Sequence, residues 1–307
     1  MKGCAEVSLN LLAPGEAADL LLRTGEVDDV DAAASSAAAE IAELCGNLPL
    51  YISICGGVIL GYEGDVVWHT ELVAMLKEDR VGVIDDGSGD FTVERLVDRS
   101  LDRIKDEVVS LVFMALGVCA EDVLIAMPVA QLICGADAQL IAKGTKLNAI
   151  VMRRALKTLV DRNLLQGSVA SGVQMHDIVR DLVRSRLGGD GGIRAKQRAV
   201  VAAFVSACSA DGWAEDTVEL YAEQALEQHM VEALLPDPLD DAEAHTWLLH
   251  ANELIVTSAA TALGSAALES MSAVKERAGD LVGAARVVWA ARQGRELPAA
   301  ASTELAF

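Results

Sequence analysis

His176 and Asp177 are the residues whose types and position best suit a contact with phosphate. They follow a short apolar stretch ending at Met175 and precede an amphipathic stretch, which would place them between a strand and a helix. A histidine at such a junction can donate a ring N–H to a phosphate, and its charge changes near physiological pH. The aspartate can cap the helix and hold the imidazole in place. Because an isolated histidine more often has a structural role, this prediction depends on the surrounding pattern.

A second candidate contact is Pro49, which ends the sequence Gly46-Asn47-Leu48-Pro49. A proline at a helix start has no N–H to satisfy and can lie edge-on against a flat ligand. Asn47 tolerates the positive φ that a turn before the helix would require. The pattern fits both a ligand contact and an ordinary helix N-terminus.

The sequence shows no pattern typical of catalysis or of metal binding. No GxxxxGK[ST] motif occurs, so we expect no loop of backbone N–H groups that cradles phosphates. Residues 81–86, an apolar run followed by two aspartates, resemble a magnesium-binding element of ATPases, but we expect a surface loop there. His229, His245 and His250 lack the spacing of zinc ligands, and no Ser, His and Asp set indicates hydrolysis. We therefore predict no catalytic residue, no metal and no enzymatic activity of the chain alone.

The elements that must position these residues are predicted to be mainly α-helical. Hydrophobic residues make up 52% of the chain and aromatic residues 4%, and the alanine-rich stretch 31–43 favours helix. Short helices with short connections are typical of a small bundle, and the turn formers at 85–90 indicate its boundary. The helices predicted in this bundle are 14–23, 31–45, 49–61 and 69–76.

Helices followed by a single hairpin predict a winged helix in the next part of the chain. Helical patterns at 93–108, 109–118, 123–134 and 147–163 precede two strands, 164–169 and 173–175, joined by a turn at 170–172. After a glycine-rich hinge at 187–192, helices at 194–209, 213–235 and 240–258 and a pair within 259–292 suggest a repeat-like helical tail. The predicted domains are a bundle at 1–84, a winged helix at 93–188 and a tail at 193–307.

Four stretches resemble, in the same order, the helical and winged-helix subdomains of NB-ARC domains, the STAND-class signalling ATPases of plant resistance proteins and apoptotic ATPases. Residues 40–50 (EIAELCGNLPL) resemble the segment that ends in Gly-Leu-Pro-Leu, with Asn47 where the family usually has glycine. Residues 100–125 resemble the opening of the winged helix, with Cys119-Ala120 in place of Phe-Pro. Residues 156–165 resemble the next helix and the first wing strand, and 173–181 (VQMHDIVRD) resemble the closing Met-His-Asp motif.

The resemblance implies a signal-transduction regulator with a defence-response-like role. In the family the proline packs on adenine and the histidine senses the β-phosphate of ADP, so these roles would belong to Pro49 and His176. Nucleotide exchange opens such a switch and permits oligomerisation. Since the phosphate-binding loop is missing, the resemblance implies a fragment or degenerate copy that binds ADP or ATP weakly or not at all and cannot hydrolyse ATP alone.

Two other functions remain open. The chain could be a protein-interaction module whose helical tail binds a partner without nucleotide. The winged helix could instead bind DNA, because residues 143–198 contain twelve Lys or Arg against four Asp or Glu. Arg153, Arg154, Lys157 and Arg162 share one predicted helix, and DNA binding requires them to lie on one exposed face. The formal net charge of −21 opposes nucleic-acid binding by the whole chain, so we do not expect it.

Cysteine placement and hydropathy predict a cytoplasmic protein without membrane contact. Cys45, Cys55, Cys119 and Cys134 lie in apolar surroundings, which indicates reduced thiols in the core. The longest apolar stretch, 48–60, contains two glycines and is shorter than a membrane span, and 1–14 lacks the pattern of a secretory signal.

Overall fold

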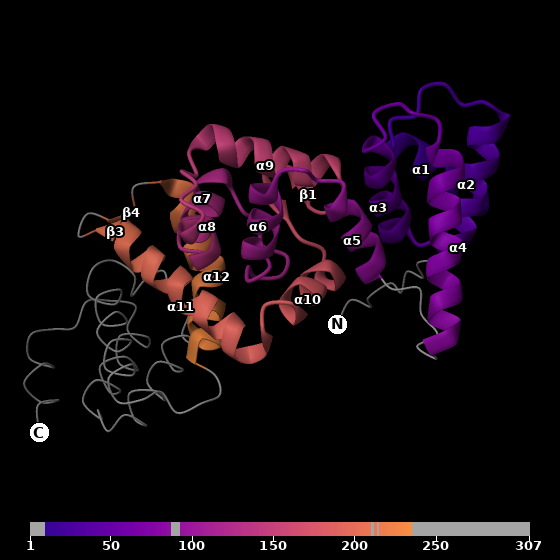
Figure 1. Ribbon diagram of the computed structural model, residues 1–307. Helices are drawn as coiled ribbons and strands as arrows, with labels where there is room; N and C mark the ends of the chain where they lie inside the picture. The colour runs from indigo at the N-terminus through magenta and orange to yellow at the C-terminus, as the bar shows by residue number, and fades with distance from the viewer. Residues whose placement is uncertain (1–9, 87–92, 210–211, 214, 235–307) are drawn as a thin grey trace, which may run out of the picture. The chain divides into compact units, whose positions relative to one another are not determined.

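The computed structural model describes residues 10–86, 93–209, 212–213 and 215–234 (Figure 1). The predicted mainly α-helical class is confirmed, and in the part of the chain that the structure describes two small hydrogen-bonded pairs of strands lie among the helices. The chain divides into two compact units, one of residues 1–107 with 158–166 and one of 108–157 with 167–307. We call these unit 1 and unit 2 and describe each by itself. They do not coincide with the predicted domains 1–84, 93–188 and 193–307, which remain predictions.

The first three helices of unit 1 have starts that are marked by proline or aspartate. Pro14 and Pro49 occupy first-turn positions, where their missing N–H costs nothing. Asp31 caps the second helix by accepting from the Ala34 N–H at 2.7 Å. The helices are α1 (Pro14–Thr24), α2 (Ala32–Leu44), α3 (Pro49–Leu60), α4 (Trp68–Asp86) and α5 (Val93–Asp102).

The core of unit 1 forms where α1 packs against α2 and α3, α2 against α4, and α3 against α5. Large apolar side chains fill it, and two glycines of α3 allow very close approach of neighbouring segments. A Cβ on Gly56 would lie 2.0 Å from the Thr24 hydroxyl oxygen, and one on Gly57 would lie 2.1 Å from the Arg162 carbonyl oxygen. The fully buried core side chains include Leu21, Ile41, Ile52, Leu72, Leu76 and Leu96.

Two sequence predictions in this region are wrong. Residues 81–86 are not a surface loop, because α4 continues through Asp86; the strong turn formers begin only with Gly87. The helix expected at 93–108 ends at Asp102, where a turn bonds the Ile104 N–H to the Leu101 carbonyl at 2.8 Å. Directly after this turn, the Arg103 guanidinium lies 3.8 Å from the centre of the Tyr62 ring, which is a cation–π contact.

The middle of the chain has the element order of a winged helix. Ile125 pairs with Val173 through two backbone hydrogen bonds of 2.7 and 3.0 Å. This isolated antiparallel bridge adds a third segment beside the predicted hairpin. Residues 169–171 connect the two hairpin strands, one residue earlier than expected. In order, the elements are α6 (Glu107–Leu116), the Ile125 bridge, α7 (Met127–Gly135), α8 (Ala138–Ala142), α9 (Ala149–Asp161), β1 (Gln166–Ser168), β2 (Gly172–Gln174) and α10 (Asp177–Ser185).

The glycine-rich stretch 187–192 is not the hinge that its composition suggested, since helix α11 (Gly189–Ala207) already begins inside it. Gly188 and Gly189 have φ values of +86° and +65°, and a Cβ on Gly192 would lie 1.7 Å from the Leu187 carbonyl oxygen. The glycines therefore form a tight turn, in which positive φ favours glycine and a side chain at position 192 would clash.

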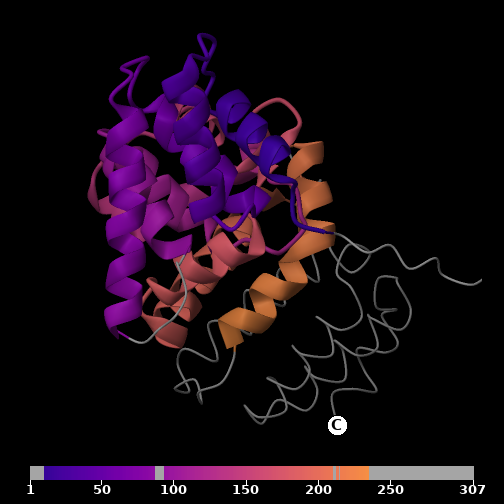
Figure 2. The same cartoon turned by 90° about the vertical axis from the view of Figure 1, so that its right-hand side faces the viewer.

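Two helices follow α10 and pack side by side. Helix α12 (Asp216–Leu234) lies against α11, and both contact α7 (Figures 1 and 2). Between them, β3 (Cys208–Ser209) and β4 (Gly212–Trp213) form a short antiparallel pair that the sequence pattern did not indicate. The helices predicted at 240–258 and within 259–292 lie outside the described residues, as does most of the repeat-like tail. In the part of the chain that the structure describes, no helix has the length and apolarity needed to cross a membrane.

Candidate functional site

His176 lies at the start of α10, as its N-cap residue. Its Nδ1 accepts a hydrogen bond from the Ile178 N–H at 3.3 Å. An accepting Nδ1 carries no proton, so in the neutral ring the proton is on Nε2. The side chain is part-exposed, and Nε2–H is the ring donor that the cap does not use.

The cap of α10 corrects one sequence prediction. Asp177 was expected to cap the helix, but it is the first residue of α10 and is exposed, and the histidine itself caps the backbone. Asp177 instead places a negative charge in the first turn, where it interacts favourably with the helix dipole and stabilises the helix. Both residues therefore stabilise the helix start, by different means.

Buried contacts fix α10 to the segment that follows α6. The Arg180 side chain is only 8% exposed, forms an ion pair with Glu121 at 2.5 Å and donates to the Cys119 carbonyl at 3.4 Å. A Cβ on Gly117 would lie 2.2 Å from a methyl group of Val183, so that glycine permits the close packing of α10. The stretch around Cys119 that resembled the opening of a winged helix thus holds the helix that carries His176.

Pro49 begins α3 and is exposed. The turn before it has the backbone that the sequence suggested, since Gly46 and Asn47 have φ values of +63° and +55°. The Asn47 side-chain oxygen is buried without a hydrogen-bond partner. Pro49 belongs to unit 1 and His176 to unit 2, and within each unit the residue stands at the start of a helix.

The basic helix α9 does not meet the condition set for DNA binding. Arg153, Arg154 and Lys157 are exposed on one face, as their spacing along a helix allows. Arg162, however, follows the end of α9, is half-buried and donates from Nη1 to the Gly57 carbonyl at 3.0 Å. Burial and the neighbouring Arg103 lower the pKa of Arg162. The four cations therefore do not form one exposed face.

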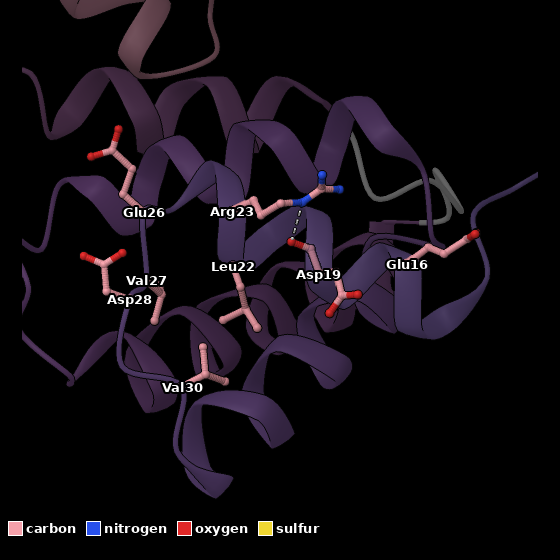
Figure 3. A pocket seen from close by; sticks show the side chains of 8 residues that line it. All are labelled: Glu16, Asp19, Leu22, Arg23, Glu26, Val27, Asp28 and Val30. Atoms are coloured by element: carbon pink, nitrogen blue, oxygen red, sulfur yellow. Dashed lines mark hydrogen bonds between the residues drawn. The ribbon is translucent and has the colours of Figure 1, made fainter.

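An open pocket of about 850 Å³ lies beside α1 and the segment that follows it (Figure 3). Four of its side chains are carboxylates, and Arg23 donates back to the Asp19 backbone carbonyl at 3.3 Å. Among the described residues, no group of three or more histidine, cysteine, aspartate or glutamate residues could hold a metal ion. The lining residues are Glu16, Asp19, Leu22, Arg23, Glu26, Val27, Asp28 and Val30.

Sequence reasoning missed a polar network buried in unit 2, because it considered His229 only as a zinc ligand. His229 is fully buried, with Nε2 2.9 Å from the Tyr221 hydroxyl and Nδ1 2.5 Å from the Gln197 side-chain oxygen. Because the amide oxygen can only accept, Nδ1 carries the proton and Nε2 accepts from Tyr221. Burial lowers the pKa of His229 to about 4, in keeping with a neutral ring.

The network continues through Gln197 to a carboxylate. The Gln197 amide nitrogen donates to the Val118 carbonyl at 3.0 Å and to Glu232 at 2.5 Å. Glu232 also forms an ion pair with Arg184 at 2.9 Å. Burial alone would raise the pKa of Glu232, but hydrogen bonds from Gln228 and Gln197 and attraction to Arg184 lower it. The network therefore fastens α10, α11 and α12 to the segment after α6.

Comparison with models of known protein families and with curated proteins finds no match to this sequence.

Proposed function

We propose that this chain is a regulatory module of the NB-ARC type that senses a nucleoside diphosphate and acts in signal transduction. The observation that carries the proposal is the cap of α10, in which the Ile178 N–H engages Nδ1 of His176 and leaves Nε2–H for a phosphate oxygen. A helix N-terminus adds favourable potential for an anion. Asp177, in the first turn, works against that potential.

The remaining roles follow the resemblance and are part of the same proposal. Pro49, exposed at the start of α3, would lie against the adenine ring. Affinity for ADP is weak, because the sequence contains no phosphate-binding loop, and the chain does not hydrolyse ATP by itself. The module acts in the cytoplasm and binds protein partners through its C-terminal helices. Its oligomerisation depends on which nucleotide is bound.

The test is isothermal titration of ADP at millimolar concentration into the purified chain and two variants at one position. His176→Ala removes both the cap and the phosphate donor, and His176→Asp restores a strong cap but repels phosphate. We expect saturable binding by the unchanged chain, weaker binding by His176→Ala, and the weakest by His176→Asp. His69→Ala, at a part-exposed histidine of unit 1, is the matched control and should bind normally.

ADP binding by His176→Asp separates the ligand role of His176 from its role as a helix cap. If capping were its entire function, His176→Asp would bind ADP as well as the unchanged chain, because aspartate is a good N-cap residue. Absence of ADP binding by the unchanged chain would refute the proposal and favour a protein-interaction module without nucleotide.

A further inference from the structure

Two cysteines meet in the core of unit 1, one at the end of α2 and one inside α3. The sulfur atoms of Cys45 and Cys55 lie 3.6 Å apart. Cys45 is the C-cap residue of α2, and Cys55 lies in the second turn of α3. Both side chains are almost fully buried, at 2% and 0% exposure. A disulfide requires sulfurs about 2.0 Å apart, so the thiols need a further approach of about 1.5 Å.

The ten-residue separation places the whole turn before Pro49 between the two sulfurs. That turn contains Gly46 and Asn47 with positive φ, and its Asn47 N–H bonds the Ala42 carbonyl at 2.9 Å. A covalent link between Cys45 and Cys55 would therefore close a short ring around the turn. Such a ring removes conformations that the open chain could adopt.

We propose that Cys45 and Cys55 are a redox modification site at which glutathione disulfide forms a reversible intramolecular disulfide that locks the turn between α2 and α3. This inference does not depend on nucleotide binding. Two observations carry it, the sulfur contact and the position of the pair on either side of a backbone turn.

The reaction balances with glutathione disulfide as the only co-reactant. One cysteine thiolate attacks a sulfur of glutathione disulfide, forms a mixed disulfide and releases one glutathione thiolate. The second cysteine then attacks the protein sulfur of the mixed disulfide and releases a second glutathione thiolate. The two protons lost by the protein thiols pass to these thiolates, so two thiols are oxidised while one glutathione disulfide is reduced to two glutathiones.

Burial controls when the pair reacts. The hydrogen bond with Cys45 and burial raise the pKa of the Cys55 thiol, so this sulfur stays protonated in the closed core. Attack needs a thiolate that glutathione can reach, and opening of the turn supplies it. Oxidation of the folded chain is therefore slow. The thiol–disulfide equilibrium should for this reason also be reached by refolding the unfolded chain in the same buffer.

Another buried pair offers an internal control. Cys119 and Cys134 are also buried, but the Cys119 thiol is engaged by the Tyr221 hydroxyl. Burial raises the pKa of Cys119 to about 12 and also raises that of Cys134. We expect this pair to remain reduced under conditions that oxidise Cys45 and Cys55.

The sequence makes the readout specific, because trypsin separates the two pairs. No lysine or arginine occurs between Arg23 and Lys77, so residues 24–77 form one peptide whose cysteines are Cys45 and Cys55. Residues 106–143 likewise form one peptide whose cysteines are Cys119 and Cys134. An internal disulfide lowers the mass of a peptide by two hydrogen atoms and blocks alkylation at both sulfurs.

The experiment equilibrates the full chain in glutathione buffers of graded ratio, once from the folded reduced protein and once by refolding from denaturant. The expected result is an internal disulfide in peptide 24–77 and free thiols in peptide 106–143. Half-oxidation should need at least about tenfold less glutathione disulfide in the folded chain than in denaturant, since folding holds the sulfurs together.

Single variants locate the bond and complete the test. In Cys45→Ser or Cys55→Ser, peptide 24–77 should gain at most one glutathione and never lose two hydrogens. The proposal is overturned if the unchanged chain, refolded at the most oxidising ratio, keeps two alkylatable thiols in this peptide. It is equally overturned if half-oxidation occurs at the same ratio in the folded and the denatured chain.

Discussion

Acidification should destabilise unit 2 through one buried imidazole, His229. Its ring is fully buried, donates to Gln197 and accepts from Tyr221, so a second ring proton would have no acceptor. Burial lowers its pKa most, the charge of Glu232 raises it and the charge of Arg184 lowers it further. The result is a pKa of about 4 in the folded chain, against an ordinary value of 6.5.

The sign and size of the effect follow from proton linkage. Between pH 6.5 and about 4 the unfolded chain binds a proton at His229 and the folded chain does not, so the free energy of unfolding falls as pH falls. The full contribution is present above pH 6.5 and is lost by about pH 4. At about 1.4 kcal/mol for each tenfold change in proton affinity, this difference corresponds to about 3 kcal/mol.

Denaturant titrations at a series of pH values from 7.5 to about 4.5, followed by circular dichroism and by hydrogen exchange of α11 and α12, measure this loss. The variant His229→Gln should be less stable at pH 7.5, because a buried ring is lost, but its stability should depend less on pH. His69→Gln, at a part-exposed histidine of unit 1, serves as control and should keep the steep dependence. Equal pH dependence in the unchanged chain and in His229→Gln would refute the reasoning.

Two further substitutions test packing in each unit. Gly57→Ala places a Cβ 2.1 Å from the Arg162 carbonyl oxygen and should lower the free energy of unfolding, measured by denaturant titration, by about 1–3 kcal/mol. The control Gly15→Ala, whose Cβ would have no atom within 4 Å, should be neutral or stabilising. Equal stability of the two variants would contradict this packing. Glu121→Gln removes the nearer of the two ion-pair partners of the buried Arg180, the other being Asp181 at 3.9 Å, and should cost about 1–3 kcal/mol. Arg180→Met should recover part of this loss in the double variant; an additive double variant would show that the pair is not coupled.

Local rules were sufficient where one residue type determines the backbone. Pro14, Asp31 and Pro49 marked helix starts that the structure shows, and Asn47 adopts the positive φ that its type permits. These features depend on interactions within a few residues. The sequence pattern could therefore predict them without knowledge of the tertiary fold.

Local rules failed where tertiary contacts determine the outcome. The glycines at 188–192 look like a flexible linker by composition, yet they make a tight turn leading into α11. Arg103, directly after the end of α5, contacts the ring of Tyr62 far earlier in the sequence, and no local pattern indicates this contact. The partners of His229 come from two helices and include Gln197, thirty-two positions earlier in the sequence, so no spacing rule could reveal them.

For the candidate site, the sequence identified helix starts but not how they are arranged. It placed His176 at a junction of strand and helix, and the structure shows that this residue is itself the cap. The difference matters chemically, because the cap determines which ring nitrogen carries the proton. The roles of His176 and Pro49 toward a nucleotide remain predictions.

Unit 1 consists of two separate parts of the chain, and this has a consequence for folding during synthesis. Its first part ends at Glu107, and its second part, residues 158–166, comes only after the chain has passed through fifty residues of unit 2. At about 5–20 residues per second on the ribosome, α3 must wait several seconds for the segment that carries Arg162. During that interval Gly57 of α3 lacks the Arg162 backbone that packs against it, so a nascent chain paused before residue 166 would be a natural substrate for a chaperone.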